Sequence, residues 1–477
     1  MLQKQNKYSR LVTNTLLLGI SSFSSKILSV LLTRLYTTVL GVAAYGSKET
    51  LEQTANVLIP LMGLGIAQAV IRFGLDKDIP ADNVFTNGLV TILLGLTGIV
   101  LVSPIFSLIP HLQNEILLMI VYMFTSCLRL LCCQFVRSQM RIRLYAIDGI
   151  LASLYTVGFN MLYLVYFKMG TTGYFLSIIS ADLASTLGLF IVMGLWRYIN
   201  FKQFNKPLFL QMLRYSLPLV PSTISWWLVS TSDRFFITYI VGQSATGLYG
   251  VAAKPSGIVS VISTFFTEAW QISAVTDGQD EDKGAFFSTV YAAVMAVAFI
   301  IGGGLIFFCQ LAVRLLSGNA EYYEAWRYVP FLAISSVFTF LQSFMSSVFV
   351  VEKKSTLTLY SVLIGAGTSL ALNSVLIPIL GLYGAGIANM SSSMVIFVVR
   401  AIMARRFITM RYQPVKLLIN TALILAETMV MILRPWGWIA WCGLALMGLI
   451  GLNVKELVVA AQHVFFAKKK HEKESKL

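Results

Sequence analysis

The chain has 477 residues, of which 57 % are hydrophobic and only 12 % are charged. A water-soluble globule would carry about twice that share of charged residues, so this composition excludes one. The net charge of +15 would indicate nucleic-acid binding in a soluble protein, but here most lysines and arginines stand in the gaps between apolar runs, where they direct membrane insertion. We therefore expect a lipid bilayer around the chain and no nucleic-acid partner.

Long apolar runs follow one another along almost the whole chain. A helix needs roughly 20 apolar residues to cross the hydrocarbon core, and about fourteen segments reach this length. A transmembrane β-barrel would show shorter segments of alternating polarity, so the runs predict an all-α polytopic membrane protein. The predicted spans are 11–39, 49–74, 84–108, 114–138, 145–167, 173–198, 210–240, 247–272, 284–310, 326–350, 356–378, 383–404, 415–433 and 437–460.

The basic residues fall mainly in every second gap between these spans. One set of gaps, together with the two ends of the chain, holds 23 of the 36 lysines and arginines, and the other set holds 5. Cytoplasmic loops carry such an excess in membrane proteins, so the pattern predicts that both termini are cytoplasmic. We expect a multi-pass protein of the cytoplasmic (inner) cell membrane, whose short loops leave no room for a soluble domain.

Glycine-spaced loops recur in corresponding gaps of the two halves. The loop Gly41–Gly46 follows the first span and Gly242–Gly247 follows the seventh, while Gly170–Gly173 precedes the sixth span and Gly381–Gly384 precedes the twelfth. Two repeated bundles are a common way to build an alternating-access transporter with its substrate site between them. We therefore predict an N-terminal six-helix lobe at 1–205, a C-terminal six-helix lobe at 206–410, two additional helices at 411–462 and a cytoplasmic tail at 463–477.

The region of the seventh and eighth spans has a distinctive order of prolines, charges and glycines. It contains Arg214–Ser222 (RYSLPLVPS), Ser232–Arg234 (SDR), Thr246–Tyr249 (TGLY) and Ala252–Lys254 (AAK). This order resembles the signature of the seventh and eighth helices in polysaccharide-unit flippases. Weaker similarities to the same family extend over the rest of the chain, at Asn14–Gly46, Phe266–Trp270 and Gly381–Ala388.

This resemblance implies membership in the multidrug/oligosaccharidyl-lipid/polysaccharide exporter superfamily, whose fold is two six-helix lobes that form a V, often with two extra helices. It implies a flippase that moves polyprenyl-diphosphate-linked oligosaccharide repeat units from the cytoplasmic to the outer leaflet for surface polysaccharide assembly. The polymerase and the chain-length regulator of the same pathway are then expected partners. A lipid-II-type peptidoglycan flippase shares the lobed fold and the basic cavity, and it stays the closest alternative.

Charged residues inside apolar runs are costly to bury and therefore mark functional sites. Basic residues outnumber acidic ones within the spans, which suits a diphosphate headgroup. Lys26 lies near the middle of the first span, and Lys254 precedes Pro255 in the eighth, so we expect both to face a wet cavity. The candidates for substrate contact are Lys26, Arg34, Arg129, Trp226, Trp227, Asp233, Arg234 and Lys254.

Several of these candidates also have a structural interpretation, which the sequence leaves open. Arg34 and Arg234 lie near the outer ends of their helices, where a basic side chain can anchor at the membrane interface. Arg129 can pair with an acid, Asp233 can pair with its neighbour Arg234, and the two tryptophans can pack in a core. The choice between these interpretations depends on what each side chain contacts.

Three acidic residues within the spans, Asp182, Glu268 and Glu427, are candidates to bind a coupling proton or sodium ion, or to pair with a basic residue. The five cysteines and three histidines form no zinc-type motif, so we expect no metal and no cofactor. A membrane polymerase or ligase would need catalytic histidines or acids, commonly on a substantial outer loop. The outer loops here are brief, so we expect a transporter without catalytic residues.

Overall fold

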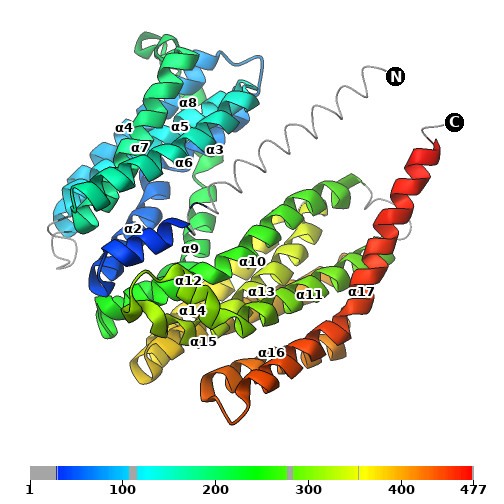
Figure 1. The fold of residues 1–477 in the computed structure, drawn as a ribbon. Helices are drawn as coiled ribbons and strands as arrows, with labels where there is room; N and C mark the ends of the chain where they lie inside the picture. Colours follow the sequence, from blue (N-terminus) through cyan, green and yellow to red (C-terminus); the bar gives the residue numbers. More distant parts are fainter. Residues whose placement is uncertain (1–27, 29–30, 107–114, 277–282, 353, 475–477) are drawn as a thin grey trace. The chain divides into compact units, whose positions relative to one another are not determined.

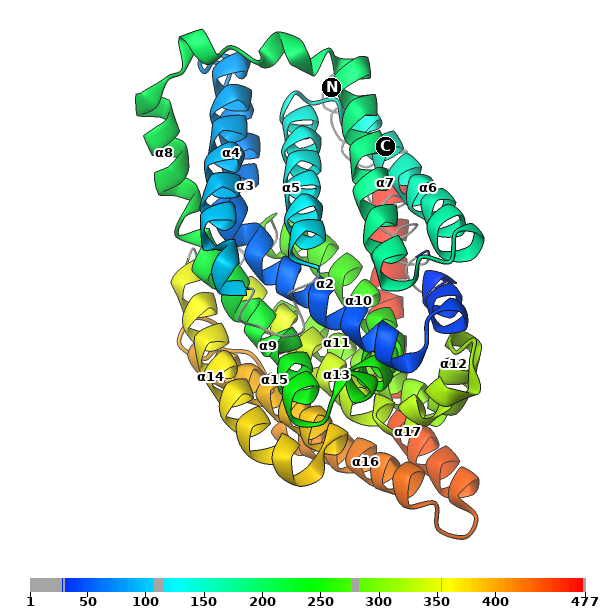
Figure 2. The same ribbon diagram turned by 90° about the vertical axis from the view of Figure 1, so that its left-hand side faces the viewer.

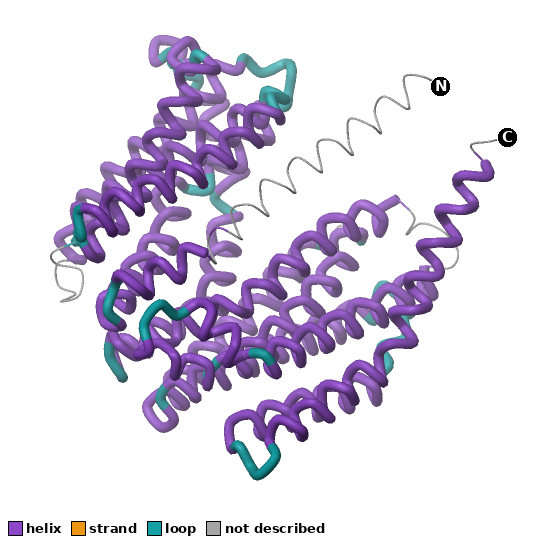
Figure 3. Tube along the Cα trace, viewed as in Figure 1, coloured by secondary structure: helices purple, strands orange, loops and turns teal. Residues whose placement is uncertain are grey.

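The computed structural model describes residues 28, 31–106, 115–276, 283–352 and 354–474. Within these ranges the chain forms helices and loops and no β-strand (Figure 3), so the predicted all-α fold is confirmed. Ten of the described helices are long and apolar enough to cross a membrane. They become eleven if α2 (Val42–Gly63) and α3 (Ile66–Gly74), which meet at an angle of 49°, form one broken span.

Two further helices, α9 (Leu219–Ile240) and α10 (Gln243–Thr276), are long enough to cross the membrane but more polar than the ten. At 1.5 Å per residue they extend for roughly 33 Å and 51 Å, against a hydrocarbon core of about 30 Å. The predicted fourteen spans are reached only if these two helices and the first predicted span are added to the eleven. Most of that first span, 11–39, lies outside the described residues, which include its helical end at 31–39.

The chain divides into two compact units, and the first consists of Met1–Trp227 with Gln243–Gly247. At its centre α5 packs against α2, α3, α4 and α7, and α6 lies along α7 (Figure 2). The helix α6 ends in a π-helical turn at Met161–Tyr166, and two short 3₁₀ turns follow α7. Besides α2 and α3, the helices of this unit are α4 (Ala81–Phe106), α5 (Ile116–Ser138), α6 (Ile142–Asn160), α7 (Gly170–Met193) and α8 (Lys206–Ser216).

The second unit consists of Leu228–Gly242 and Leu248–Leu477 (Figure 1). Its most buried helix is α13, which packs against α11 and α15. The division between the units falls inside α9 and not in the loop after residue 205, and the assignment of six helices to each lobe stays a prediction. The remaining helices are α11 (Lys283–Phe307), α12 (Cys309–Leu316), α13 (Val329–Val351), α14 (Ser355–Leu380), α15 (Leu382–Ala404), α16 (Pro414–Leu433) and α17 (Trp438–Glu474), with a 3₁₀ segment at Ala320–Arg327.

The loops before α7 and α15 share two features of their glycines, which supports the predicted repeat. Gly170 and Gly381 both have φ +59°, a left-handed conformation that glycine adopts without strain. Three residues later, Gly173 and Gly384 each lie close to the backbone of the preceding helical segment: a Cβ at Gly384 would overlap the Leu376 carbonyl, and one at Gly173 would lie 3.0 Å from the Tyr163 carbonyl oxygen. Each glycine pair thus reverses the chain in little space and lets two consecutive helices pack closely at their ends.

Large apolar side chains cover much of the outer surface of both units. On α7, Ile191 and Val192 are 70 % and 68 % exposed, and on α17 Met447 is 70 % exposed. In water such a surface would be an aggregation hazard, whereas lipid tails solvate it without cost. The exposed apolar faces and the long apolar helices together establish a multi-pass membrane protein.

Candidate functional site

The first unit contains a charged cavity of about 430 Å³ between α2, α5, α6 and α7. Polar groups from all four helices face it. Such a cavity within membrane-spanning helices is costly unless it holds water or a polar ligand, because hydrocarbon offers no hydrogen bonds. Its polar lining consists of Asn56, Tyr122, Ser126, Arg129, Gln134, Tyr145, Asp148 and Asp182.

Arg129 on α5 is the one cation among the side chains that line this cavity. Its two terminal nitrogens lie 3.7 Å from Asp148 Oδ2 and 3.5 Å from Asp182 Oδ1, and its Nε donates a hydrogen bond of 3.0 Å to Ser185 Oγ. The two distances to the carboxylates are too long for hydrogen bonds. Arg129 is therefore held by the hydrogen bond to Ser185 and by charge attraction to the two aspartates, and its side chain stays 30 % exposed.

The two aspartates are fixed by short hydrogen bonds to serines. Ser126 Oγ donates to Asp182 Oδ2 and Ser185 Oγ donates to Asp148 Oδ1, both at 2.6 Å. Hydrogen bonds of this length are strong, so the two serines hold the carboxyl groups in place beside Arg129.

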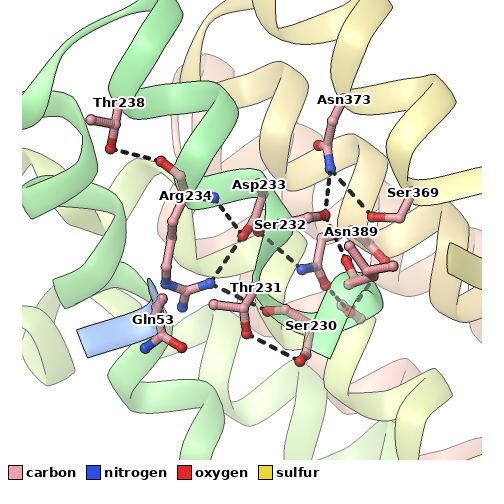
Figure 4. Close-up of polar contacts among 12 residues, drawn as sticks. Gln53, Ser230, Thr231, Ser232, Asp233, Arg234, Thr238, Ser369, Asn373 and Asn389 are labelled. Atoms are coloured by element: carbon pink, nitrogen blue, oxygen red, sulfur yellow. Dashed lines mark hydrogen bonds and ion pairs between the residues drawn. The ribbon is translucent and has the colours of Figure 1, made fainter. Parts of the chain in front are cut away.

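The second unit contains a buried polar cluster around Asp233 on α9 (Figure 4). Asp233 Oδ1 accepts hydrogen bonds from the backbone N–H of Arg234 at 2.9 Å and from Arg234 Nη1 at 3.0 Å. Its other oxygen, Oδ2, accepts from Asn389 Nδ2 on α15 at 3.1 Å. The Asp233 side chain is 2 % exposed and that of Arg234 is 12 % exposed, and the guanidinium lies 5.8 Å from the centre of the Tyr249 ring. The predicted neighbour pair is therefore present in the structure.

Amides and hydroxyls extend this cluster to α13, α14 and α15 (Figure 4). Ser335 contacts both Asn389 and Ser393, and Asn373 Nδ2 lies 3.2 Å from Ser369 Oγ and 3.5 Å from Ser232 Oγ. The sequence predicted Asp233 and Arg234 as site residues but not these neutral ones. Asn373 and Asn389, each inside an otherwise apolar helix, could have indicated the cluster in the sequence, because burial of an amide is costly unless it is hydrogen-bonded.

For the other predicted site residues the structure gives a degree of burial but no contact that assigns a role. Arg34 is exposed, Trp226 and Trp227 are half-buried on α9, and Lys254 is half-buried on α10 immediately before Pro255. Their roles in substrate contact stay predictions. Lys26 lies outside the described residues, and so does the side chain of Glu268 on α10.

Neither cluster has the composition of a metal centre. Among the described residues, no three His, Cys, Asp or Glu side chains gather closely enough to hold a metal ion. Glu427, the third acid predicted to bind a coupling ion, is completely buried on α16, a helix that contributes no residue to either cluster described above.

Comparison with known proteins identifies relatives of this chain. Residues 11–270, more than half of the chain, match a family described as "Polysaccharide biosynthesis protein". An uncharacterized membrane protein of Methanocaldococcus jannaschii is 23 % identical over 381 residues, which cover 76 % of this chain and 90 % of that protein.

Two groups of solved structures share its fold. The lipid II flippase MurJ, in an inward closed conformation, aligns with a TM-score of 0.67 and 13 % identity over 94 % of this chain and 99 % of its own. An inward-facing multidrug resistance transporter of the MATE family, in the MOP superfamily, aligns with a TM-score of 0.64 and 18 % identity over 80 % of this chain and 95 % of its own. The predicted superfamily fold is thereby confirmed.

Proposed function

The chain belongs to the polysaccharide biosynthesis protein family, and from this membership we propose that it is a flippase for polyprenyl-diphosphate-linked oligosaccharide units. The matched residues 11–270 carry the proposal, because they include the charged cavity and the segment that resembles the flippase signature. The expected direction is from the cytoplasmic to the outer leaflet, with both termini in the cytoplasm. The polymerase and chain-length regulator of the same pathway would act on the exported unit.

The physical task of such a protein is to carry a charged sugar headgroup across a layer that cannot solvate it. A diphosphate in bare hydrocarbon would lose its hydration at a prohibitive cost. Polar and cationic side chains within the helices can replace part of that hydration, while the polyprenyl tail stays in lipid. Arg129 supports this proposal, because its long contacts to Asp148 and Asp182 can be exchanged for contacts to phosphate oxygens.

The fold is compatible with a mechanism of alternating access. The MATE transporters that share it have been solved in both inward-facing and outward-facing conformations. We propose that this chain also exposes its substrate site to each side in turn, and that Lys26 and Lys254 contact the diphosphate. A flexible lysine holds an anion more transiently than a rigid arginine fork, which favours release on the outer side.

A second candidate substrate is lipid II, because the structure of a lipid II flippase aligns with 94 % of this chain. Both substrates share the polyprenyl diphosphate, and only lipid II carries a peptide. The test is to delete the gene and identify the lipid-linked glycan that accumulates on the cytoplasmic side of inverted vesicles, by mass spectrometry. Accumulation of a peptide-free oligosaccharide diphosphate supports the proposal, whereas accumulation of lipid II, or of neither, contradicts it.

A further inference from the structure

The carboxyl group of Glu427 on α16 is buried without a polar partner among the described residues. The side chain is 0 % exposed, and within the described part of the chain neither carboxyl oxygen has a hydrogen-bond partner. None of the ion pairs among the described residues includes it. Asp148, Asp182 and Asp233, by contrast, accept hydrogen bonds from serine, asparagine or arginine. Glu427 is therefore the exception that requires an explanation.

The carboxyl lies at the junction of three helices, α11, α16 and α17, which pack against one another (Figure 1). It points at Gly303 of α11, where a Cβ would lie 3.1 Å from Glu427 Oε2. The side chains of Leu446 and Leu449 on α17 close the same space. A glycine on α11 thus makes room for the carboxyl, and leucines on α17 exclude water from it.

No basic group compensates the carboxyl from any of the packed helices in the described part of the chain. The titratable groups in its vicinity are the thiols of Cys442 on α17 and Cys309 at the start of α12, together with Arg434 after the end of α16. The guanidinium of Arg434 instead packs over the rings of Trp326 and Trp438, with its Cζ 4.2 Å and 5.1 Å from the ring centres. Beside Gly303, Gly302 of α11 lies against Val337 of α13 and Ile424 of α16, which are both apolar.

The position of Glu427 along its helix makes the burial severe. It follows Pro414 by thirteen residues, so it lies roughly 20 Å along α16 at 1.5 Å per residue. A span of about 30 Å places that point well inside the hydrocarbon layer. An unpaired carboxylate there would cost several kcal/mol, which a neutral acid avoids.

We propose that Glu427 is a proton-binding site, and that its protonated form is what allows α16 and α17 to pack on α11. Loss of the proton would create a charge that only water or a cation can stabilise. The seam between α11 and the pair α16–α17 would then have to open. The proposal concerns packing within the second unit and does not depend on which lipid is transported.

Proton linkage gives a direct test with the whole protein in detergent micelles. Thermal unfolding of the wild type and of Glu427→Gln is followed from pH 6 to pH 9. Glutamine has the shape of the neutral acid and cannot ionise, so the comparison cancels all other titrating groups. If the folded state holds one proton that the unfolded state releases, the unfolding equilibrium constant of the wild type rises about tenfold per pH unit relative to the variant.

If the ratio of the unfolding equilibrium constants of the wild type and the variant stays constant over this pH range, the proposal is wrong. A second measurement uses only the wild type and so does not depend on folding of the variant. Maleimide labelling of Cys442 is compared by mass spectrometry with that of Cys127, a buried thiol in the first unit. Both thiols gain reactivity with pH, so only opening of the seam raises their ratio.

A Cys442 to Cys127 ratio that rises with pH supports the proposal, and a ratio independent of pH contradicts it. The labelling is repeated with sodium chloride replaced by choline chloride at equal ionic strength. Equal labelling in the two salts is expected for a proton site. Labelling that sodium suppresses would assign the site to a metal cation and overturn the proton assignment.

Discussion

Gly46 packs so closely against Gln243 that a Cβ at Gly46 would overlap the Gln243 carbonyl group. The contact is reciprocal, because Gly247 packs in the same way against the carbonyl of Val42. In each glycine loop, the second glycine thus meets the residue that follows the first glycine of the other loop. Such an exchange of equivalent contacts is what two copies of one motif make about a two-fold axis. It supports the predicted repeat, which similar spacing in the sequence first indicated.

This contact leads to a prediction about stability. Gly46→Ala places a methyl group on the Gln243 backbone, which cannot move away as a side chain would, so the helices must separate. We expect a loss of about 1–3 kcal/mol, the usual range for overpacking. Gly41→Ala is the matched control, since nothing lies within 4 Å of its Cβ position and its φ is −68°. Thermal unfolding in detergent measures both, and equal unfolding temperatures would refute the interpretation.

Arg129 is expected to be essential for the stability of the first unit. Arg129→Ala leaves Asp148 and Asp182 buried without a cation, which costs about 2–4 kcal/mol, toward the low end because Arg129 is partly exposed. The double variant Arg129→Ala with Asp182→Asn removes one of the stranded charges and should recover part of the loss. Unfolding temperatures of the single and double variants decide this. No recovery in the double variant would show that Asp182 does not need Arg129.

In the second unit, Asp233→Ala should be more destabilising than Asp233→Asn. Alanine leaves the Arg234 guanidinium without its carboxylate and the Asn389 amide without its acceptor, at a cost of about 3 kcal/mol. Asparagine keeps one oxygen for Asn389. Ser374→Ala is a suitable control, because Ser374 is exposed and its hydroxyl donates only to Ala371 of its own helix. Unfolding of all three variants in detergent checks the order, which is contradicted if Asp233→Ala matches the control.

The sequence predicted the spans and the charged residues far better than their pairings. Asp233 and Arg234 are neighbours, so their ion pair was visible in the chain itself. Arg129 and Asp182 lie on different helices, and no sequence spacing decides which acid an arginine will meet. The lack of a partner for Glu427 was equally inaccessible, since it depends on how α11 and α17 close around it. Periodicity and hydrophobicity report which face of a helix is buried, whereas pairing depends on tertiary packing.

The membrane orientation is tested by reporter fusions. The excess of basic residues in alternate gaps predicts that a reporter fused after Thr172 is outside and one fused after Gln413 is inside. Alkaline phosphatase is active only outside and a fluorescent protein such as GFP only inside, so each site is examined with both. Two sites with the same activity pattern would contradict the predicted number of spans between them. Both patterns reversed would place the termini on the outer side.

The last prediction concerns transport. Lys254 is half-buried on α10 beside Pro255, where a proline interrupts the backbone hydrogen bonds of the helix. If it contacts the diphosphate, Lys254→Ala should reduce export of the lipid-linked glycan at least about tenfold, the equivalent of one charge-assisted hydrogen bond. Lys254→Arg keeps the charge and should retain part of the activity. Lys202→Ala, at an exposed position between α7 and α8, should export normally.

Export is measured in a deletion strain as surface glycan per unit of membrane-inserted protein. Normal export by Lys254→Ala would exclude this lysine from the substrate path, while an equal loss in Lys254→Arg would assign it a packing role.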